Sequence, residues 1–323
     1  MGKQHHIAGQ VPIKGHEGPE MDRRGALECM IWAGTGMLWT LAGGLPVSAT
    51  LGEARAATIA ASPFTFLQIS DSHVGFDKPA NPDALGTLKE AIGKINALPQ
   101  KPSFMIHTGD ITHLSKDGQF DDADQIIKSV GVPVFYVPGE HDMIDDGQGK
   151  AYLDRYGKGT KGAGWYSFDQ SGVHFIGLVN VVNLKAGGLG QLGPEQLAWL
   201  ADDLKAVSRS TPVVVFAHIP LWAVYPEWGW GTSDGAAALA MLKDYGSVTI
   251  LNGHIHQTMQ KVEGNAAFYT ARSTAFPQPE PGKAASPGPM KVPAEQLRSF
   301  LGIRSVDFVA VDKPLAIVDR TLA

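Results

Sequence analysis

Five short runs of β-branched and aromatic residues in this sequence are each followed, within a few positions, by His, Asp or Glu, residue types that serve as metal ligands in proteins. Turn-forming residues bound each run, which is typical of strands. The runs and the residues after them are 64–69 with Asp71 and His73; 104–107 with Asp110; 134–137 with Glu140 and His141; 213–216 with His218; and 248–251 with His254 and His256. Any fold of this chain must accommodate five strand ends that carry polar His and carboxylate side chains.

Helical patterns separate the first three of these strands. Apolar residues recur on one face of residues 82–97, and a second helix is predicted for 120–130. Strands that alternate with helices in this way favour a parallel sheet. The later chain predicts a helix and three hairpins, at residues 194–207, 165–168 with 173–179, 258–262 with 267–271, and 308–311 with 315–318. The sequence therefore predicts an α/β protein with mixed sheets stacked between helices.

The polar residues after the strands are expected to converge. In open α/β sheets, sites form at the carboxyl ends of the strands. The spacing of two residues between Asp71 and His73, and between His254 and His256, also puts each pair on one side of an extended backbone. The chain has one cysteine, Cys29, so a cysteine cluster is excluded and a metal site must use His, Asp, Glu, Asn and water.

The ordered set D-x-H, G-D, G-E-H-D, A-H and G-H-x-H resembles the signature of the calcineurin-like metallophosphoesterase superfamily, over Asp71 to His256. The resemblance implies a four-layer α/β/β/α sandwich of two mixed β-sheets with a dinuclear metal site at its edge. It also implies the metal ligands: Asp71, His73 and His256 for the first ion, Asp110 bridging both, and Glu140, His218 and His254 for the second. His141 would stabilise the transition-state charge or protonate the leaving oxygen.

This ligand chemistry suits phosphoester hydrolysis. Two ions about 3.5–4 Å apart lower the pKa of a bridging water and clamp the attacking and leaving oxygens. Imidazole and carboxylate suit a pair of divalent or mixed-valence transition-metal ions, drawn from Mn, Fe, Zn or Co. The chain departs from the family pattern twice. Glu140 replaces a ligand Asn, and His113 replaces an Asp that often orients the catalytic His, so Asp142 or a water would take over that pairing.

Three tryptophans follow His218 in a long loop at residues 222–232 and are candidates for a substrate wall, the alternative being an aromatic cluster that packs on the body. They are Trp222, Trp228 and Trp230. His113 is a candidate for substrate contact in catalysis, or a turn residue. His107 and His174 lie within predicted strands and are expected to be core or edge histidines.

The N-terminal segment resembles an export signal. Arg23 and Arg24 precede an apolar run and small-residue cleavage sites, which is typical of a twin-arginine signal peptide. We therefore predict a disordered tail and signal at 1–56 and a single domain at 57–323, with a motif core at 64–276, a Pro/Gly-rich loop at 277–293 and C-terminal strands at 306–319. The mature protein would be periplasmic or secreted, would meet the twin-arginine translocation machinery and would lack a stable membrane span; the alternative is an uncleaved anchor.

Charge limits the substrates. The net charge is −5, and no basic stripe is visible, so no nucleic acid partner is expected. The sequence predicts an exported hydrolase that cleaves phosphate mono- or diesters of small molecules by attack of a metal-bridging hydroxide. The alternatives are a cyclic-nucleotide phosphodiesterase and a non-catalytic metal-binding exported protein.

Overall fold

The structure, a computed structural model, describes residues 37–42, 45–50, 63–144, 148–309 and 315–323. The chain divides into two units, Met1–Ile59 and Ala60–Ala323, which are described separately. In the first unit, β1 (Met37–Ala42) pairs antiparallel with β2 (Leu45–Thr50). Arg23 and Arg24 lie outside the described residues, so the predicted signal peptide stays a prediction. No helix in the described part of the chain has both the length and the apolar character needed to span a membrane.

Five strands form the first sheet of the second unit, in the order β13-β12-β3-β4-β5. The consecutive strands β3 (Phe64–Ile69), β4 (Phe104–His107) and β5 (Val134–Tyr136) are parallel, as predicted, with β5 at one edge of the sheet. β12 (Gly302–Phe308) and β13 (Ala316–Thr321) complete the sheet with antiparallel pairing. The prediction of a strand at 308–311 was wrong in extent, because the strand begins at Gly302. Its polar residues Arg304, Ser305 and Asp307 interrupt the apolar signal that marks a strand.

Six strands form the second sheet, in the order β10-β11-β9-β8-β7-β6. Its four inner strands are parallel: β7 (Val173–Gly177), β8 (Val213–Ala217), β9 (Val248–Asn252) and β11 (Ala266–Thr270). The two edge strands are antiparallel to their neighbours: β6 (Tyr166–Gln170) and β10 (Gln260–Glu263). The two predicted hairpins in this region are therefore confirmed.

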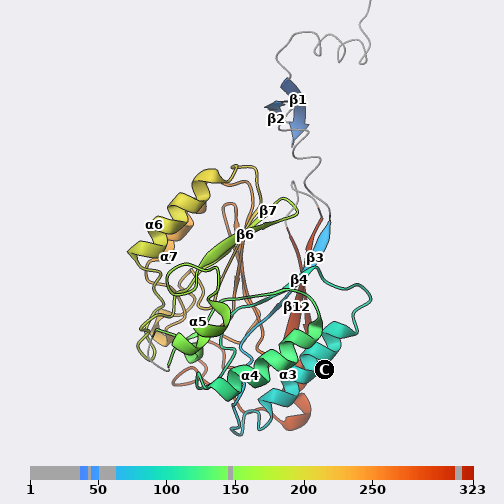
Figure 1. Ribbon diagram of the computed structural model, residues 1–323, viewed down its shortest axis with the longest axis vertical. Helices are drawn as coiled ribbons and strands as arrows, with labels where there is room; N and C mark the ends of the chain where they lie inside the picture. Colours follow the sequence, from blue (N-terminus) through green and yellow to red (C-terminus); the bar gives the residue numbers. More distant parts are fainter. Residues whose placement is uncertain (1–36, 43–44, 51–62, 145–147, 310–314) are drawn as a thin grey trace, which may run out of the picture. The chain divides into compact units, whose positions relative to one another are not determined.

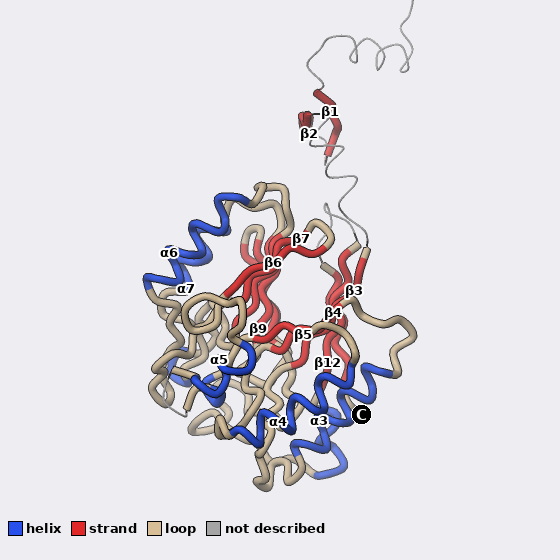
Figure 2. The backbone as a smooth tube through the Cα atoms, in the orientation of Figure 1, coloured by secondary structure: helices blue, strands red, loops and turns tan. Residues whose placement is uncertain are grey.

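Helices cover the outer face of each sheet (Figures 1 and 2). Helix α3 (Ala84–Asn96) and helix α4 (Asp117–Ile127) pack on the five-stranded sheet, and helix α6 (Pro194–Asp203) and helix α7 (Gly235–Leu242) pack on the six-stranded sheet. Helix α5 (Lys150–Tyr156) and helix α8 (Leu297–Phe300) are short. The sequence pattern predicted α3, α4 and α6 but not α5, α7 or α8.

Alternate residues of the central strands enter different cores. Leu67 and Ile69 of β3 pack under the helices, while Phe66 points to the other face. There it lies 5.0 Å from the ring of Phe104 and 5.4 Å from the ring of Phe175 on the opposite sheet. An aromatic core therefore holds the two sheets together, and the predicted four-layer α/β/β/α sandwich is confirmed.

His174 joins the six-stranded sheet to helix α6. The side chain is 5% exposed, its Nδ1 lies 2.8 Å from Asp169 Oδ1, and its Nε2 lies 2.9 Å from Asp203 Oδ2. Burial alone would lower the pKa of His174, but the hydrogen bonds and charges of Asp203 and Asp169 outweigh burial and raise it. Protonated His174 therefore forms ion pairs with Asp169 and Asp203. These pairs lie far from the strand ends that bear the predicted ligands.

We expect His174→Gln to destabilise the fold in a pH-dependent way. Because the folded-state pKa is raised, the stabilisation is fully present below the unfolded value of about 6.5 and is lost as pH rises through the folded pKa. The variant should lose roughly 1–3 kcal/mol at pH 6 and less at pH 9. Urea unfolding of variant and wild type at both pH values measures this difference. Lys205→Gln, which breaks an exposed pair with Asp202, is the control; an equal loss for His174→Gln at both pH values would contradict the ion-pair account.

Candidate metal centre

The predicted ligands meet at the carboxyl ends of strands from both sheets. Asp71 and His73 follow β3, Asp110 follows β4, and Glu140 begins a short 3-10 helix, Glu140–Asp142, after β5. From the six-stranded sheet, His218 follows β8, and His254 and His256 follow β9. Parallel strands carry these ends to one edge of each sheet, so the sandwich itself brings the five segments together.

The side chains form two groups that share Asp110. Asp71, His73 and His256 place one potential ligand atom each within 4.8 Å of one another, and so do Glu140, His218 and His254. Asp110 Oδ2 lies 3.4 Å from His73 Nε2 in the first group and 3.4 Å from His218 Nε2 in the second. A single carboxylate oxygen thus lies at the same distance from one histidine nitrogen of each group, which suits a residue shared between two ions.

Glu140 lies within the second group. Its Oε2 is 2.9 Å from His218 Nε2, and its Oε1 is 3.1 Å from His254 Nδ1. The two carboxylate oxygens therefore face two different imidazoles. An Asn at this position would offer one oxygen, so Glu140 adds both a donor atom and a negative charge.

The backbone at the ligands is strained. Five of them have positive φ angles between 40° and 71°: Asp71, His73, Asp110, His254 and His256. Each such conformation costs a non-glycine residue about 1–2 kcal/mol, and such strain clusters at functional sites. Neighbouring glycines are required by close approach, since a Cβ added to Gly139 would lie 2.1 Å from Asp110 Oδ1.

Hydrogen bonds fix the ring nitrogens that face the centre. His218 Nδ1 lies 2.7 Å from the carbonyl of Thr108, and His256 Nδ1 lies 2.6 Å from the carbonyl of Phe276. A carbonyl oxygen only accepts, so each Nδ1 donates its proton and each Nε2 is the ring nitrogen left to face the centre. These carbonyls have no signature in the sequence.

Unsatisfied polar atoms show that the residues fit a metal pair. His218 Nε2 and Glu140 Oε2 are buried and form no hydrogen bond of acceptable geometry. His256 Nε2 lies only 3.3 Å from His73 Nε2. Buried groups of this kind carry a penalty unless a cation lies among them. Nitrogen and oxygen donors without sulfur suit Mn, Fe, Zn or Co. The seven residues of the two groups would be the ligands.

Charges within the centre shift its pKa values in opposite directions. Burial would raise the pKa of Asp71, but the neighbouring His256 and His218 lower it to about 2. Burial would lower the pKa of His218, but Asp110 and Glu140 raise it well above its ordinary value. The carboxylate of Asp71 therefore stays ionised and contributes negative charge to the centre.

Asp142 has a structural role in the site. It is fully buried, and its carboxylate accepts hydrogen bonds from the backbone N–H groups of Ile111, Thr112 and Gly139 at 2.8–3.0 Å. Burial and then the charge of Asp110 raise the pKa of Asp142 to about 6. Asp142 therefore connects the loop after β4 to the loop after β5. Its oxygens accept from backbone N–H groups rather than from His141, the partner that the sequence analysis had proposed.

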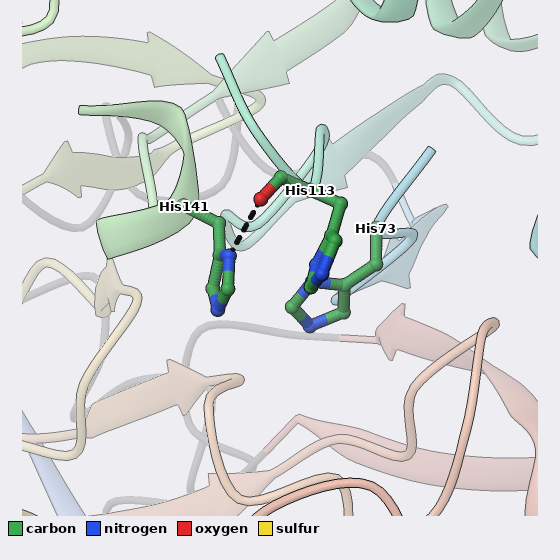
Figure 3. A group of neighbouring side chains, drawn as sticks. All are labelled: His73, His113 and His141. Carbon is green, nitrogen blue, oxygen red and sulfur yellow. Dashed lines mark hydrogen bonds between the residues drawn. The ribbon is translucent and has the colours of Figure 1, made fainter. Parts of the chain in front are cut away.

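His141 is oriented by a carbonyl instead. Its Nδ1 lies 2.8 Å from the backbone oxygen of His113. The dashed line in Figure 3 marks this hydrogen bond. The His113 ring stacks on the His141 ring at 4.7 Å with an interplanar angle of 17°. Burial and then the charge of His141 lower the pKa of His113 to about 4, so the His113 ring is neutral. The residue that replaces the family's Asp therefore still orients His141, through its backbone.

His107 is a buried core histidine, as expected from its place in a strand. Its Nε2 lies 2.8 Å from Ser72 Oγ, and its Nδ1 accepts from Gly109 N–H at 3.2 Å. Burial lowers the pKa of His107 to about 3. The neutral ring braces the loop that carries Asp71 against the loop that carries Asp110, which the sequence had not indicated.

A cavity of about 550 Å³ opens over the centre. Trp228 and Trp230 line it together with Lys185 and Gln278, and the segment 287–289 of the Pro/Gly-rich loop closes one part of its wall. Trp222 lies elsewhere, with its ring 4.9 Å from that of Phe268. The cavity brings together two of the three predicted tryptophans, along with His113 and His141.

Known proteins are similar to this chain in sequence. CPPED1 of Mus musculus, a serine/threonine-protein phosphatase, is 28% identical over 180 residues, which are 50% of this chain and 57% of that protein. A probable glycerophosphodiester phosphodiesterase, GpdQ of Arcobacter nitrofigilis, is 27% identical over 225 residues, 64% of this chain and 77% of that protein. This chain thus spans little more than half the length of the mouse relative.

Solved structures share the fold. A dimetal phosphatase from Danio rerio superposes with a TM-score of 0.62 at 15% identity, covering 80% of this chain and 96% of that chain. The purple acid phosphatase PPD1 of yellow lupin superposes with a TM-score of 0.55 at 14% identity, covering 81% and 52%. The sequence family described as calcineurin-like phosphoesterase matches residues 64–258, the segment that holds every residue of the two ligand groups. With its sandwich and ligand order in agreement with that match, the chain belongs to the calcineurin-like phosphoesterase family.

Proposed function

We propose that this protein is a metal-dependent hydrolase of small phosphate mono- or diesters. The observation that carries the proposal is Asp110 Oδ2, placed 3.4 Å from a histidine nitrogen in each of the two ligand groups. Two transition-metal ions bound there would supply an activated water and neutralise phosphoryl charge. The names of the mouse phosphatase and of the bacterial phosphodiesterase support phosphoester chemistry without selecting between the two ester classes.

His141 is the proposed proton donor to the leaving oxygen. Its Nδ1 is held by the His113 carbonyl, so the opposite nitrogen, Nε2, is left for the cavity that His141 lines. His141 N–H also donates to Asp110 Oδ1 at 2.9 Å, which fixes the backbone beside the centre. A positioned acid of this kind contributes about 10²–10⁴-fold to such reactions.

The cavity suits a small ester with an apolar group. Its volume lies within the usual range for small-molecule sites. Trp228 and Trp230 line it with apolar ring surface, their rings meeting edge-on at 86°, and Lys185 offers a cation outside the ligand groups. A cyclic-nucleotide phosphodiesterase fits the same description. Turnover of p-nitrophenyl phosphate against bis-p-nitrophenyl phosphate, with Mn, Fe, Zn and Co each supplied, tests the proposal, and absence of turnover with every metal would contradict it.

A non-catalytic metal-binding role is the second candidate. The observation that favours it is the reach of Glu140, whose two oxygens contact both histidines of the second group. A carboxylate that closes the coordination of an ion leaves less room for water. Turnover separates the two candidates, whereas metal content does not.

Export is also part of the proposal. The support is the order of Arg23, Arg24, the apolar run and the small residues after it. A protein loaded with its metals before export would fold in the cytoplasm and act in the periplasm or outside the cell.

The first expectation concerns metal content. Protein expressed with ample metal should hold close to two transition-metal ions per chain, because seven residues form two groups with a shared carboxylate. His254→Ala should weaken the second ion and retain the first. Elemental analysis after dialysis measures both, with His174→Gln as the control that keeps both ions. A single ion in the wild type would rule out the dinuclear centre.

The second expectation concerns Glu140 as a ligand. Glu140→Asn should keep measurable hydrolysis and should change metal preference or loosen the second ion, because one donor and one charge are lost. Glu140→Ala should weaken that ion by at least about tenfold and abolish activity. Metal titration and hydrolysis assays are the measurements. A Glu140→Asn protein with full occupancy and unchanged preference but no turnover would make Glu140 catalytic instead.

The third expectation concerns the signal. Replacing both Arg23 and Arg24 by Lys should leave the precursor in the cytoplasm, because the translocation machinery recognises the paired arginines. Cell fractionation followed by immunoblotting measures the distribution. Export at the wild-type level would instead indicate a general secretory signal or an anchor.

A further inference from the structure

His113 lies beside His73 because the chain segments after β3 and β4 stay paired beyond the strand ends. His73 N–H donates to the carbonyl of Asp110, Val74 N–H to that of Ile111, and His113 N–H to that of Val74, each at 2.9 Å. A parallel bridge between Val74 and Thr112 continues the same register. The backbone therefore sets residue 113 against a proposed ligand of the first ion.

The two rings meet through their Nδ1 atoms. His73 Nδ1 and His113 Nδ1 are 3.4 Å apart and are hydrogen-bonded. The opposite nitrogen of His73, Nε2, faces the centre, 3.4 Å from Asp110 Oδ2 and 3.3 Å from His256 Nε2. One side of the His73 ring thus faces the ligand groups and the other faces His113. Figure 3 shows the side chains of His73 and His113 next to each other.

The direction of this hydrogen bond follows from the position of the ligand atom. A histidine that binds an ion through Nε2 carries its proton on Nδ1, so His73 donates and His113 Nδ1 accepts. His218 and His256 meet the same requirement with the carbonyls of Thr108 and Phe276. For His73, the acceptor is a side chain that mutation can remove.

The acceptor is itself held in place. The His113 ring stacks on His141 at 4.7 Å and meets the Phe76 ring edge-on at 5.1 Å. Its carbonyl accepts from His141 Nδ1 at 2.8 Å. His113 therefore contacts both a proposed metal ligand and the proposed proton donor, through different atoms.

We propose that His113 is a positioning residue for the metal centre, whose Nδ1 accepts the hydrogen bond of His73 and thereby fixes the His73 ring for the first ion. The inference rests on the proposed dinuclear centre. It differs from a catalytic role, in which His113 would contact substrate in the cavity, because its effect is on metal affinity. Groups that orient a metal-binding histidine typically contribute about 10–100-fold to metal affinity.

Two variants of His113 test the inference. His113→Phe keeps a flat ring against His141 and Phe76 but removes the acceptor, whereas His113→Asn places an amide oxygen near the position of Nδ1. We expect His113→Phe to bind the first ion about 10–100-fold more weakly, with the second ion unchanged, and His113→Asn to stay close to wild-type affinity. Calorimetric titration of metal-free full-length protein with Mn²⁺, and elemental analysis after dialysis, are the measurements.

A second substitution identifies which ion is affected. His254→Ala should retain one ion, the first, and the double variant His113→Phe/His254→Ala should retain none at the same Mn²⁺ concentration. Retention of that ion by the double variant would overturn the inference.

Other outcomes also contradict the positioning role. His113→Phe with both ions at wild-type affinity but no turnover would make His113 a substrate contact. Equal weakening of both ions, or a lower melting temperature of the metal-free variant, would make it a general structural residue. Equal losses in His113→Phe and His113→Asn would show that the acceptor is irrelevant. Failure of the proposed function can be told apart from failure of the positioning role. In that case the wild-type protein would bind two ions without hydrolysing any ester.

Discussion

The contact of Asp110 with both ligand groups is the interaction on which the rest of the site depends. Its Oδ2 is 3.4 Å from His73, after a strand of one sheet, and 3.4 Å from His218, after a strand of the other. The centre therefore exists only while the two sheets keep their spacing. The aromatic core of Phe66, Phe104 and Phe175 sets that spacing from the sheet interior. The aromatic core and the two ligand groups therefore both depend on the interface between the two sheets.

Buried polar bonds connect the sheets directly beneath the centre. Arg304 is 1% exposed, forms two bonds to Asp319, and reaches Gln68 Oε1 on β3 and the carbonyl of Thr270 on β11. Gln68 in turn donates to the carbonyl of Asn252 at the end of β9. A buried guanidinium is costly unless all its donors are used, and here its bonds reach both sheets. The strained ligand loops thus rest on a polar layer as well as on the aromatic core, which is how several unfavourable φ angles persist together.

Sequence reasoning grouped the proposed ligand residues because they follow strands, and strands carry a periodic signal. The same reasoning failed where the signal is absent. β12 contains Arg304 and Asp307, whose polarity masks the strand, although Arg304 is buried by its partners. The carbonyls of Thr108 and Phe276 carry no side-chain signature, so the sequence does not predict which ring nitrogens of His218 and His256 face the centre. The pairing of His113 with His73 depends on a register that continues past the strands, which no local pattern specifies.

Glu140 changes the charge balance of the centre that Asp110 assembles. With Asn at this position, the ligand groups would carry the negative charges of Asp71 and Asp110; Glu140 adds a third. Two divalent ions held there would then exceed the three carboxylates by a single positive charge. The extra negative charge weakens the attraction of a dianionic monoester more than that of a monoanionic diester, because attraction scales with the product of the charges. A trivalent ion in one position restores the lost charge. The carboxylate of Glu140 therefore links the choice of metal to the choice of ester within the proposed function.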